Sequence, residues 1–256
     1  MLGGGGALSL DTLIEALGAD DRLAPRLTST QPLAVTAATP GGPLALGANA
    51  AFAPLLERAA ARTGLDPAML AAIVDAEAAR GRDGRWDPAS RNPRSSATGL
   101  GQFLDSTWLG EARRPGSWLN AAASSRGLLG PEGHARTGAR TALLALRTDP
   151  EASIEAVADH AAGNLARLGR AGVRAETPAA QARAAYLAHH LGLGDALRFL
   201  GSGLAEQRAG RLLTAQVGAA AADRRIASAG SATGAHREWL LAYVDQRIRP
   251  ARYAAA

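Results

Sequence analysis

The sequence predicts an all-α fold, and three observations lead to that class. Apolar residues recur at the 3.6-residue spacing of a helix in successive segments, and no stretch shows the alternation of a large β-sheet. Hydrophobic residues make up 47% of the 256 residues and aromatic residues only 4%. The core should therefore be built from Ala, Leu and Val on closely packed helices. The 30 Gly and 13 Pro residues fit many helices joined by short turns.

The N-terminal part of the chain differs from the rest. Residues 1–48 begin with a run of glycines, can form a short helix at 10–17, and continue as Pro-, Gly- and Thr-rich sequence. This composition predicts a flexible segment or linker. An amphipathic helix follows at 51–62, with Gly64 as its C-terminal stop.

The next helix begins with Asp66 as N-cap and Pro67 at the first helical position, and is predicted to end near Gly81. Residues 82–98 are dense in Gly, Pro, Asn, Ser and Asp, so a long irregular loop is expected there, with room for a minor β-hairpin. Asp105 or Ser106 can cap the helix that comes after this loop. Seven more helical segments are predicted at 118–126, 134–147, 151–169, 177–190, within 191–200, at 204–228 and at 233–248.

Composition limits the classes of partner. The net charge is +5, yet all 28 basic residues are Arg, and no Arg run of the kind that marks a nucleic-acid tail occurs. We therefore expect no nucleic-acid partner, whereas an anionic polymer such as a cell wall would suit the mild excess of positive charge. The absence of Cys excludes disulfides and thiolate metal sites. No apolar segment is long enough to span a membrane, and the N-terminus does not read as a signal peptide.

One carboxyl group stands in an unusual position. Leu70, Ile73, Val74 and Glu77 share one face of the predicted helix, so Glu77 ends a stripe that should pack on the core. Asp75 points away from that face and is expected to meet solvent. Desolvation disfavours the charged form of a carboxyl, so Glu77 could stay protonated near neutral pH and act as a general acid. The structural alternative is a Glu77 that turns to water or pairs with an Arg.

Three sequence segments carry a family resemblance. They are Glu77 with the polar loop behind it, the segment Gly99-Leu100-Gly101-Gln102, and Ala185-Tyr186. In this combination, over roughly residues 50–200, the chain resembles the lysozyme-like peptidoglycan lytic transglycosylases, in particular cell-wall hydrolases of phage-associated and alphaproteobacterial type. Two departures from the family pattern are Ala78, where a Ser is usual, and the residues that follow Tyr186.

The resemblance implies a function and a domain layout. It implies a lysozyme-like catalytic domain at 49–203, with the helices of 204–256 packed on it or appended to it. It also implies cleavage of the β-1,4 bond between MurNAc and GlcNAc, with Glu77 as the single acid and base. The expected partner is the peptidoglycan glycan strand, and a secretion or phage-type assembly is a further candidate. The expected location is the periplasm or the cell wall. A hydrolytic muramidase and a non-catalytic wall-binding module are the alternatives.

The same resemblance, with the chemistry of the side chains, gives candidate substrate-binding residues. Gly99 and Gly101 would let the backbone approach a sugar closely, with Leu100 between them. Gln102 can both donate and accept hydrogen bonds. Tyr186 could bond to Glu77 or to an N-acetyl group, or be a core tyrosine.

His189 or His190 could line the groove beside Tyr186, with His189 the candidate, although a surface or core histidine is the simpler interpretation. Phe103 and Trp108 are expected in the core rather than as sugar platforms.

A partner carboxylate and a metal site are not predicted. Asp83 lies in Gly- and Arg-rich loop sequence, Asp87 before a Pro looks like a turn residue, and Asp105 looks like a helix cap. None is therefore a convincing second carboxylate of a two-carboxylate glycosidase. Adjacent histidines point about 100° apart on a helix and do not chelate one metal, and no HExxH motif occurs. No metal and no cofactor are therefore expected.

Overall fold

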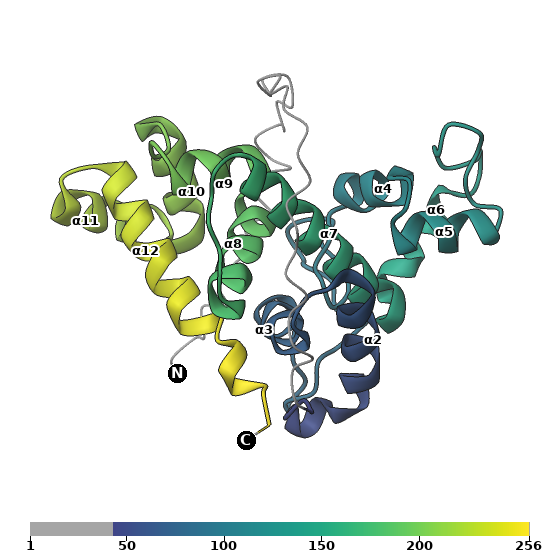
Figure 1. Ribbon diagram of the computed structural model, residues 1–256. Helices are drawn as coiled ribbons and strands as arrows, with labels where there is room; N and C mark the ends of the chain where they lie inside the picture. The colour runs from purple at the N-terminus through teal and green to yellow at the C-terminus, as the bar shows by residue number, and fades with distance from the viewer. Residues whose placement is uncertain (1–42, 256) are drawn as a thin grey trace.

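The all-α prediction is confirmed by the computed structural model, which describes residues 43–255 (Figure 1). This range holds no β-strand, and three short 3₁₀ helices, η1 (Gly47–Phe52), η2 (Leu146–Thr148) and η3 (Pro250–Arg252), supplement its α-helices. The α-helices in chain order are α2 (Ala53–Thr63), α3 (Pro67–Glu77), α4 (Asp105–Arg113), α5 (Trp118–Ser125), α6 (Arg140–Ala145), α7 (Pro150–Arg170), α8 (Pro178–Leu191), α9 (Leu193–Leu200), α10 (Glu206–Val217), α11 (Ala219–Ala229) and α12 (Ala232–Arg247).

Helix α3 lies at the centre of the molecule, in contact with α2, α7, α8 and η3 (Figure 1). Asp66 caps it by accepting hydrogen bonds from the backbone N–H groups of Ala68 and Met69. Every residue from 67 to 74 is buried, so the helix is apolar on all sides, as a central helix must be. The helix stops at Glu77 and not near Gly81, because the chain turns into an extended conformation at Ala78. Glu77 is therefore the last residue of a buried helix.

The prediction that Asp75 of α3 faces solvent is wrong. Its side chain is only 13% exposed and forms an ion pair with Arg80. Its Oδ1 also accepts a hydrogen bond of 2.8 Å from the indole N–H of Trp86, and the Tyr253 hydroxyl bonds to the same carboxylate. The loop and the C-terminus thus cover a side of α3 that sequence periodicity assigned to solvent.

The segment between α3 and α4 is irregular, as predicted, and the minor hairpin does not form as paired strands. Isolated antiparallel bridges join Arg80 to Trp86 and Thr98 to both Arg91 and Phe103. Each bridge is a single pair, so the loop is folded by turns rather than by a ladder.

Three helix predictions need correction. Asp105 does not cap α4, because Leu104 is the N-cap and the Asp105 carboxylate lies 2.8 Å from Arg147 and 3.3 Å from Arg140. The helix predicted at 134–147 begins only at Arg140 and ends as η2. The long helix predicted at 204–228 is two helices, α10 and α11, because Gly218 adopts a φ of 80° between them and turns the chain.

The two ends of the described chain are tied together. The backbone N–H of Ala45 donates to Tyr253 O at 2.8 Å, and the N–H of Ala255 donates to Pro43 O at 2.9 Å. Most of the predicted flexible segment, residues 1–42, lies outside the described residues. Residues 43–48, its remainder, are fixed by this pairing and by η1 rather than loose.

The C-terminal helices belong to the same core as the preceding ones. Leu240, Val244 and Ile248 are buried in the hydrophobic cluster that also contains the α3 and α8 side chains. Helix α12 contacts α8 directly, and η3 contacts α3. The region from residue 204 onward is thus packed on the rest of the chain and forms one flank of the molecule (Figure 1).

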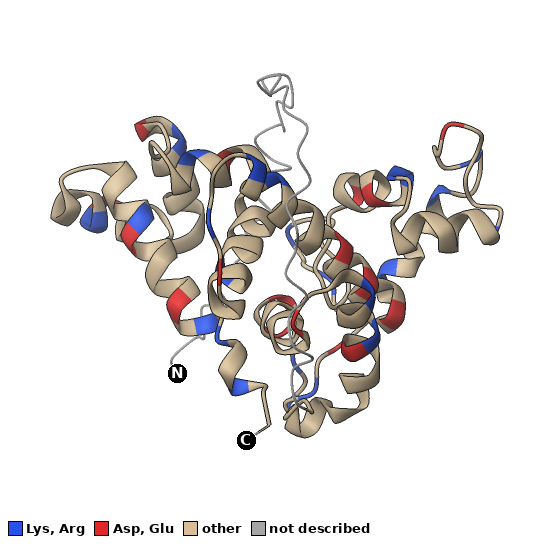
Figure 2. Ribbon diagram, viewed as in Figure 1, with Lys and Arg blue, Asp and Glu red and all other residues tan. Residues whose placement is uncertain are grey.

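Charged residues are interspersed over the helices (Figure 2). Several of the Arg residues are engaged in ion pairs, including that of Arg62 with Glu155 and Asp159 on α7. Within residues 43–255, no helix combines the length and the apolar character needed to cross a bilayer.

Candidate active site

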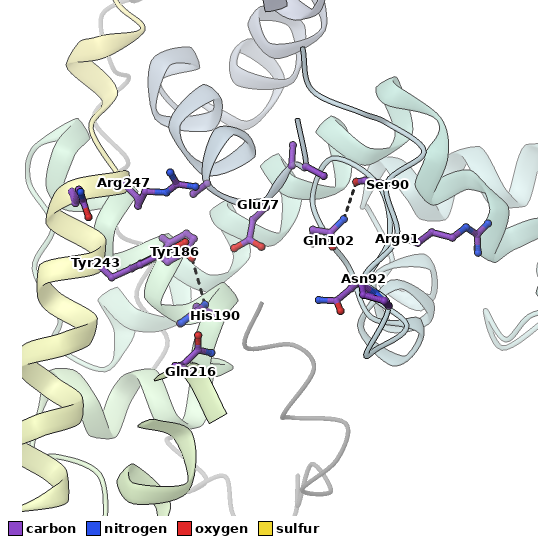
Figure 3. A pocket seen from close by; sticks show the side chains of 15 residues that line it. Glu77, Ser90, Arg91, Asn92, Gln102, Tyr186, His190, Gln216, Tyr243 and Arg247 are labelled. Carbon is purple, nitrogen blue, oxygen red and sulfur yellow. Dashed lines mark hydrogen bonds between the residues drawn. The ribbon is translucent and has the colours of Figure 1, made fainter. Parts of the chain in front are cut away.

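A pocket of about 510 Å³ brings residues from five parts of the chain together. It collects Glu77 from the end of α3, Gln102 and part of the preceding loop, Tyr186 from α8, and side chains of the C-terminal helices (Figure 3). The lining residues are Ala76, Glu77, Ala78, Ala79, Ser90, Arg91, Asn92, Pro93, Gln102, Tyr186, His190, Gln216, Tyr243, Gln246 and Arg247. Three of the sequence-predicted site residues, Glu77, Gln102 and Tyr186, therefore meet at one cavity.

Glu77 is the carboxyl group of this pocket. Burial raises its pKa from the usual value of 4.5 to about 7, and a hydrogen bond from Tyr186 and the positive charge of Arg247 oppose this rise. Near neutral pH the protonated and ionised forms are then both populated. A group in that condition can give up a proton and take one back within a single reaction.

Tyr186 and His190 lie one turn apart on α8, to one side of Glu77 (Figure 3). The Tyr186 hydroxyl bonds to the Glu77 carboxyl and lies 3.5 Å from Nδ1 of His190. The two rings stack with centroids 5.2 Å apart. His190 is 4% exposed, and burial lowers its pKa to about 3, so its ring is neutral at physiological pH.

Gln102 faces Glu77 from the loop (Figure 3). Its Nε2 donates to Gly99 O at 2.8 Å and to Ser90 Oγ at 3.1 Å. Because the Gly99 carbonyl can only accept, these bonds fix which end of the amide is nitrogen. Both amide hydrogens are used inside the protein, and Oε1 remains as the group for a ligand. Gln102 also has a φ of 46°, a left-handed conformation that costs a non-glycine residue energy.

Gly99, Leu100 and Gly101 are not among the residues that line the pocket. Leu100 is fully buried. A β-carbon on Gly101 would lie 2.6 Å from a methyl of Val157, and the Gly101 N–H donates to Ser153 Oγ at 3.0 Å. The glycines thus permit close approach of the loop to η2 and α7. Their contribution to the site is to hold Gln102.

His189 also lies away from the pocket. Its ring makes edge contacts with Phe103 and His160, at centroid distances of 5.3 and 5.5 Å, and it bonds to the Gly101 backbone. Burial lowers its pKa to about 3. Neighbouring residues on a helix point in different directions, and here the pocket side belongs to His190. Phe103 and Trp108 are 1% and 0% exposed, so both are core residues as predicted.

One wall of the pocket is not predicted by any sequence pattern. Tyr243, Gln246 and Arg247 come from the last turns of α12, and Gln216 from α10 (Figure 3). These residues form no motif with Glu77 and are far from it in the sequence. The i, i+4 spacing of Tyr243 and Arg247 puts them on one helix face, but nothing in that spacing says which groove the face meets.

Among the residues that line the pocket, Glu77 is the sole carboxylic acid. The acids considered as partners are used elsewhere. Asp83 and Asp87 accept bonds from backbone N–H groups of their own turns, at 3.0 and 2.9 Å, and Asp105 pairs with Arg147. Within residues 43–255 no group of three or more His, Cys, Asp or Glu side chains is placed to hold a metal ion.

Comparison with known proteins adds no assignment to this geometry. No protein-family model matches the chain, and no curated protein matches it.

Proposed function

We propose that the protein cleaves the β-1,4 bond between MurNAc and GlcNAc in peptidoglycan, with Glu77 as both acid and base. The observation that supports this most directly is the state of Glu77. It is a carboxyl whose pKa burial raises to about 7, in a polar pocket whose described lining contains no other carboxylate. A raised pKa suits a proton donor to a glycosidic oxygen.

The reaction proceeds in two proton transfers. Protonated Glu77 gives its proton to the glycosidic oxygen as the bond from that oxygen to C1 of MurNAc breaks. The 6-hydroxyl oxygen of the same MurNAc then bonds to C1 and loses its proton to the Glu77 carboxylate. The products are a free 4-hydroxyl on GlcNAc and a 1,6-anhydro end on MurNAc, and no water is consumed. Glu77 returns to its protonated state.

The single carboxylate favours this route over hydrolysis. An inverting glycosidase places a second carboxylate about 6.5–9.5 Å from the acid, and a retaining one places it at about 5–5.5 Å. Intramolecular attack by the sugar hydroxyl needs neither, because one group serves in turn as acid and base. Tyr186 and Arg247 oppose the rise in the pKa of Glu77 and so support the ionised form that must accept the second proton.

The other pocket residues fit recognition of an N-acetylated glycan. Gln102 Oε1 is held as an acceptor, which suits an acetamido N–H or a sugar hydroxyl. Ser90, Asn92 and Gln216 add neutral polar groups around the same cavity. A substrate of this kind would locate the protein in the periplasm or at the cell wall, where a secretion or phage-type assembly could carry it.

The test is glycan release by wild type and Glu77→Gln. The variant should stay folded by circular dichroism and release no fragments from purified sacculi; full activity in the variant would refute the proposal. Mass spectrometry of the wild-type products separates the chemistry, because 1,6-anhydro ends indicate a transglycosylase and reducing ends a hydrolase. Binding of sacculi by wild type without fragment release would identify a wall-binding module instead.

A further inference from the structure

The Tyr186 hydroxyl has two neighbours that compete for its one hydrogen. On one side is the Glu77 carboxyl, to which it bonds. On the other is Nδ1 of His190, 3.5 Å away (dashed in Figure 3). Because His190 is buried and neutral, Nδ1 can accept this hydrogen when the other ring nitrogen, Nε2, carries the proton.

We propose that His190 is a positioning residue that acts on Glu77 through the hydroxyl of Tyr186. The catalytic importance of this contact rests on the proposed function. The contact itself rests on the geometry of His190, Tyr186 and Glu77 in the pocket. When Glu77 is ionised, the Tyr186 O–H donates to the carboxylate. When Glu77 is protonated, the Tyr186 oxygen accepts from the carboxyl O–H and turns its own hydrogen to His190 Nδ1. Both forms of Glu77 are then hydrogen-bonded.

The long separation of Tyr186 and His190 agrees with the ionised arrangement. At 3.5 Å the hydroxyl is at the outer limit of a hydrogen bond to His190, as expected when its hydrogen is given to Glu77. The stacked rings, at a 24° interplanar angle, keep His190 in reach. Tyr243 of α12 stacks against both rings, with centroids 6.2 Å away in each case, and holds the pair in place.

Other charged and titratable groups surround the contact from Glu77 through Tyr186 to His190. Arg247 of α12 acts on Glu77, and Arg91 lies on the loop side of the pocket. His189 and His236 are the titratable groups that face His190, and burial lowers their pKa values to about 3 and about 4, so neither ring is charged near pH 7. Arg247 favours the ionised form of Glu77. Of the influences named here, burial and, in this proposal, His190 favour the protonated form.

Removal of the His190 acceptor and removal of the Tyr186 hydroxyl should shift the protonation equilibrium of Glu77 in opposite directions. Without the His190 acceptor, Tyr186 donates to the carboxylate at all times, so the ionised form gains and the pKa of Glu77 falls. Without the Tyr186 hydroxyl, the carboxylate loses its donor and the pKa of Glu77 rises. A purely structural histidine would produce no such opposition.

The experiment is a titration of Glu77 by ¹³C NMR in the full chain with labelled glutamate, with the Glu77→Gln spectrum identifying the signal. His190→Phe should lower the pKa and Tyr186→Phe should raise it, each by ~3- to 10-fold in the proton binding constant. His190→Phe should add nothing in the Tyr186→Phe background. His236→Phe, at another buried histidine, should leave the signal unchanged.

A second variant guards against loss of folding. His190→Asn retains a hydrogen-bond acceptor near Nδ1 and should keep the wild-type pKa. An unchanged or raised pKa in His190→Phe, or a His190 effect that persists without the Tyr186 hydroxyl, would overturn the proposal; if His190→Phe does not fold, a clear shift in His190→Asn would do the same. The titration needs no substrate, so failure of glycan cleavage and failure of this coupling are separate results.

Discussion

Gly99 lies directly against the carbonyl oxygen of Arg147, and a β-carbon at Gly99 would be 1.9 Å from that oxygen. The Arg147 side chain reaches back to the same loop, donating to Ser96 O at 2.7 Å and to Phe103 O at 2.9 Å. The loop that carries Gln102 is thus fixed to the junction of η2 and α7 by backbone contact as well as by the guanidinium group.

This contact predicts a large effect of Gly99→Ala. The added methyl has no room, and φ is 81°, so we expect a loss of at least ~3 kcal/mol in the free energy of unfolding. Gly116→Ala is the matched control, because Gly116 has the same φ of 81° with no atom within 4 Å. It should cost only the ~1 kcal/mol of a left-handed alanine. Equal losses in urea unfolding would contradict the steric explanation.

A second prediction concerns the contact between α2 and α7. Arg62 lies 2.5 Å from Glu155 and 2.6 Å from Asp159, two carboxylates that are only 7% and 8% exposed. Arg62→Met would leave both as uncompensated buried charges one turn apart, so we expect a loss of ~3 kcal/mol at pH 7. The loss should shrink at low pH, where the carboxylates become protonated.

Arg58→Met is the control for this variant. Arg58 lies on the same helix and pairs with Glu151 at 3.0 Å, but these side chains are 56% and 47% exposed. The exposed pair should contribute less than ~1 kcal/mol. Chemical denaturation of the two variants side by side compares them, and a similar loss for both would show that burial of the carboxylates does not matter.

Local signals explain which elements the sequence could predict. The bounds of α7 and α8 are predictable to within a residue or two, because Asp149-Pro150 and Thr177-Pro178 each provide an N-cap and a first-turn proline. Glu77 is predictable because helical phase and the motif that follows it both indicate this residue. These features depend on residues that are close in the sequence.

Features that depend on tertiary contacts were not predictable in this way. Helical periodicity predicts that the side of α3 that carries Asp75, away from Glu77, faces solvent. In the structure, Trp86 and Tyr253 cover Asp75. Helical propensity predicts one continuous helix across Gly218. In the structure, the positive φ of Gly218 ends α10 there, and α11 begins at the next residue. The pocket wall of Tyr243 and Arg247 arises only when α12 packs against α8, and no spacing in the sequence encodes that contact.

Arg247 gives a third prediction. Its positive charge lowers the pKa of Glu77 against the larger effect of burial. Arg247→Gln should therefore raise the pKa of Glu77, so that Glu77 loses its proton at a higher pH. The ¹³C titration of Glu77 checks this directly, and in an active enzyme the basic limb of kcat/KM should move the same way. Arg249→Gln, two residues on and outside the pocket lining, should leave the titration in place; a lowered pKa in Arg247→Gln would exclude the electrostatic role.

The last prediction joins the candidate site to stability. Burial raises the pKa of Glu77 from 4.5 to about 7, so between these pH values the folded state binds more protons at this group than the unfolded state. The free energy of unfolding must then fall as pH rises through that window, and above it the fold carries the cost of a desolvated carboxylate. Below pH 4.5 both states are protonated, and this cost is absent.

Glu77→Gln removes the charge and keeps the shape. We therefore expect the variant to match wild type near pH 4.5 and to be more stable at pH 8 by ~2 kcal/mol, reduced from the full linkage value because the pocket is open to water. Urea unfolding at the two pH values gives the difference. Glu57→Gln, at an exposed glutamate on α2, is the control and should show no pH-dependent gain. A Glu77→Gln variant that is equally stable to wild type at pH 8 would mean that Glu77 is ionised there without cost, as a solvated structural glutamate would be.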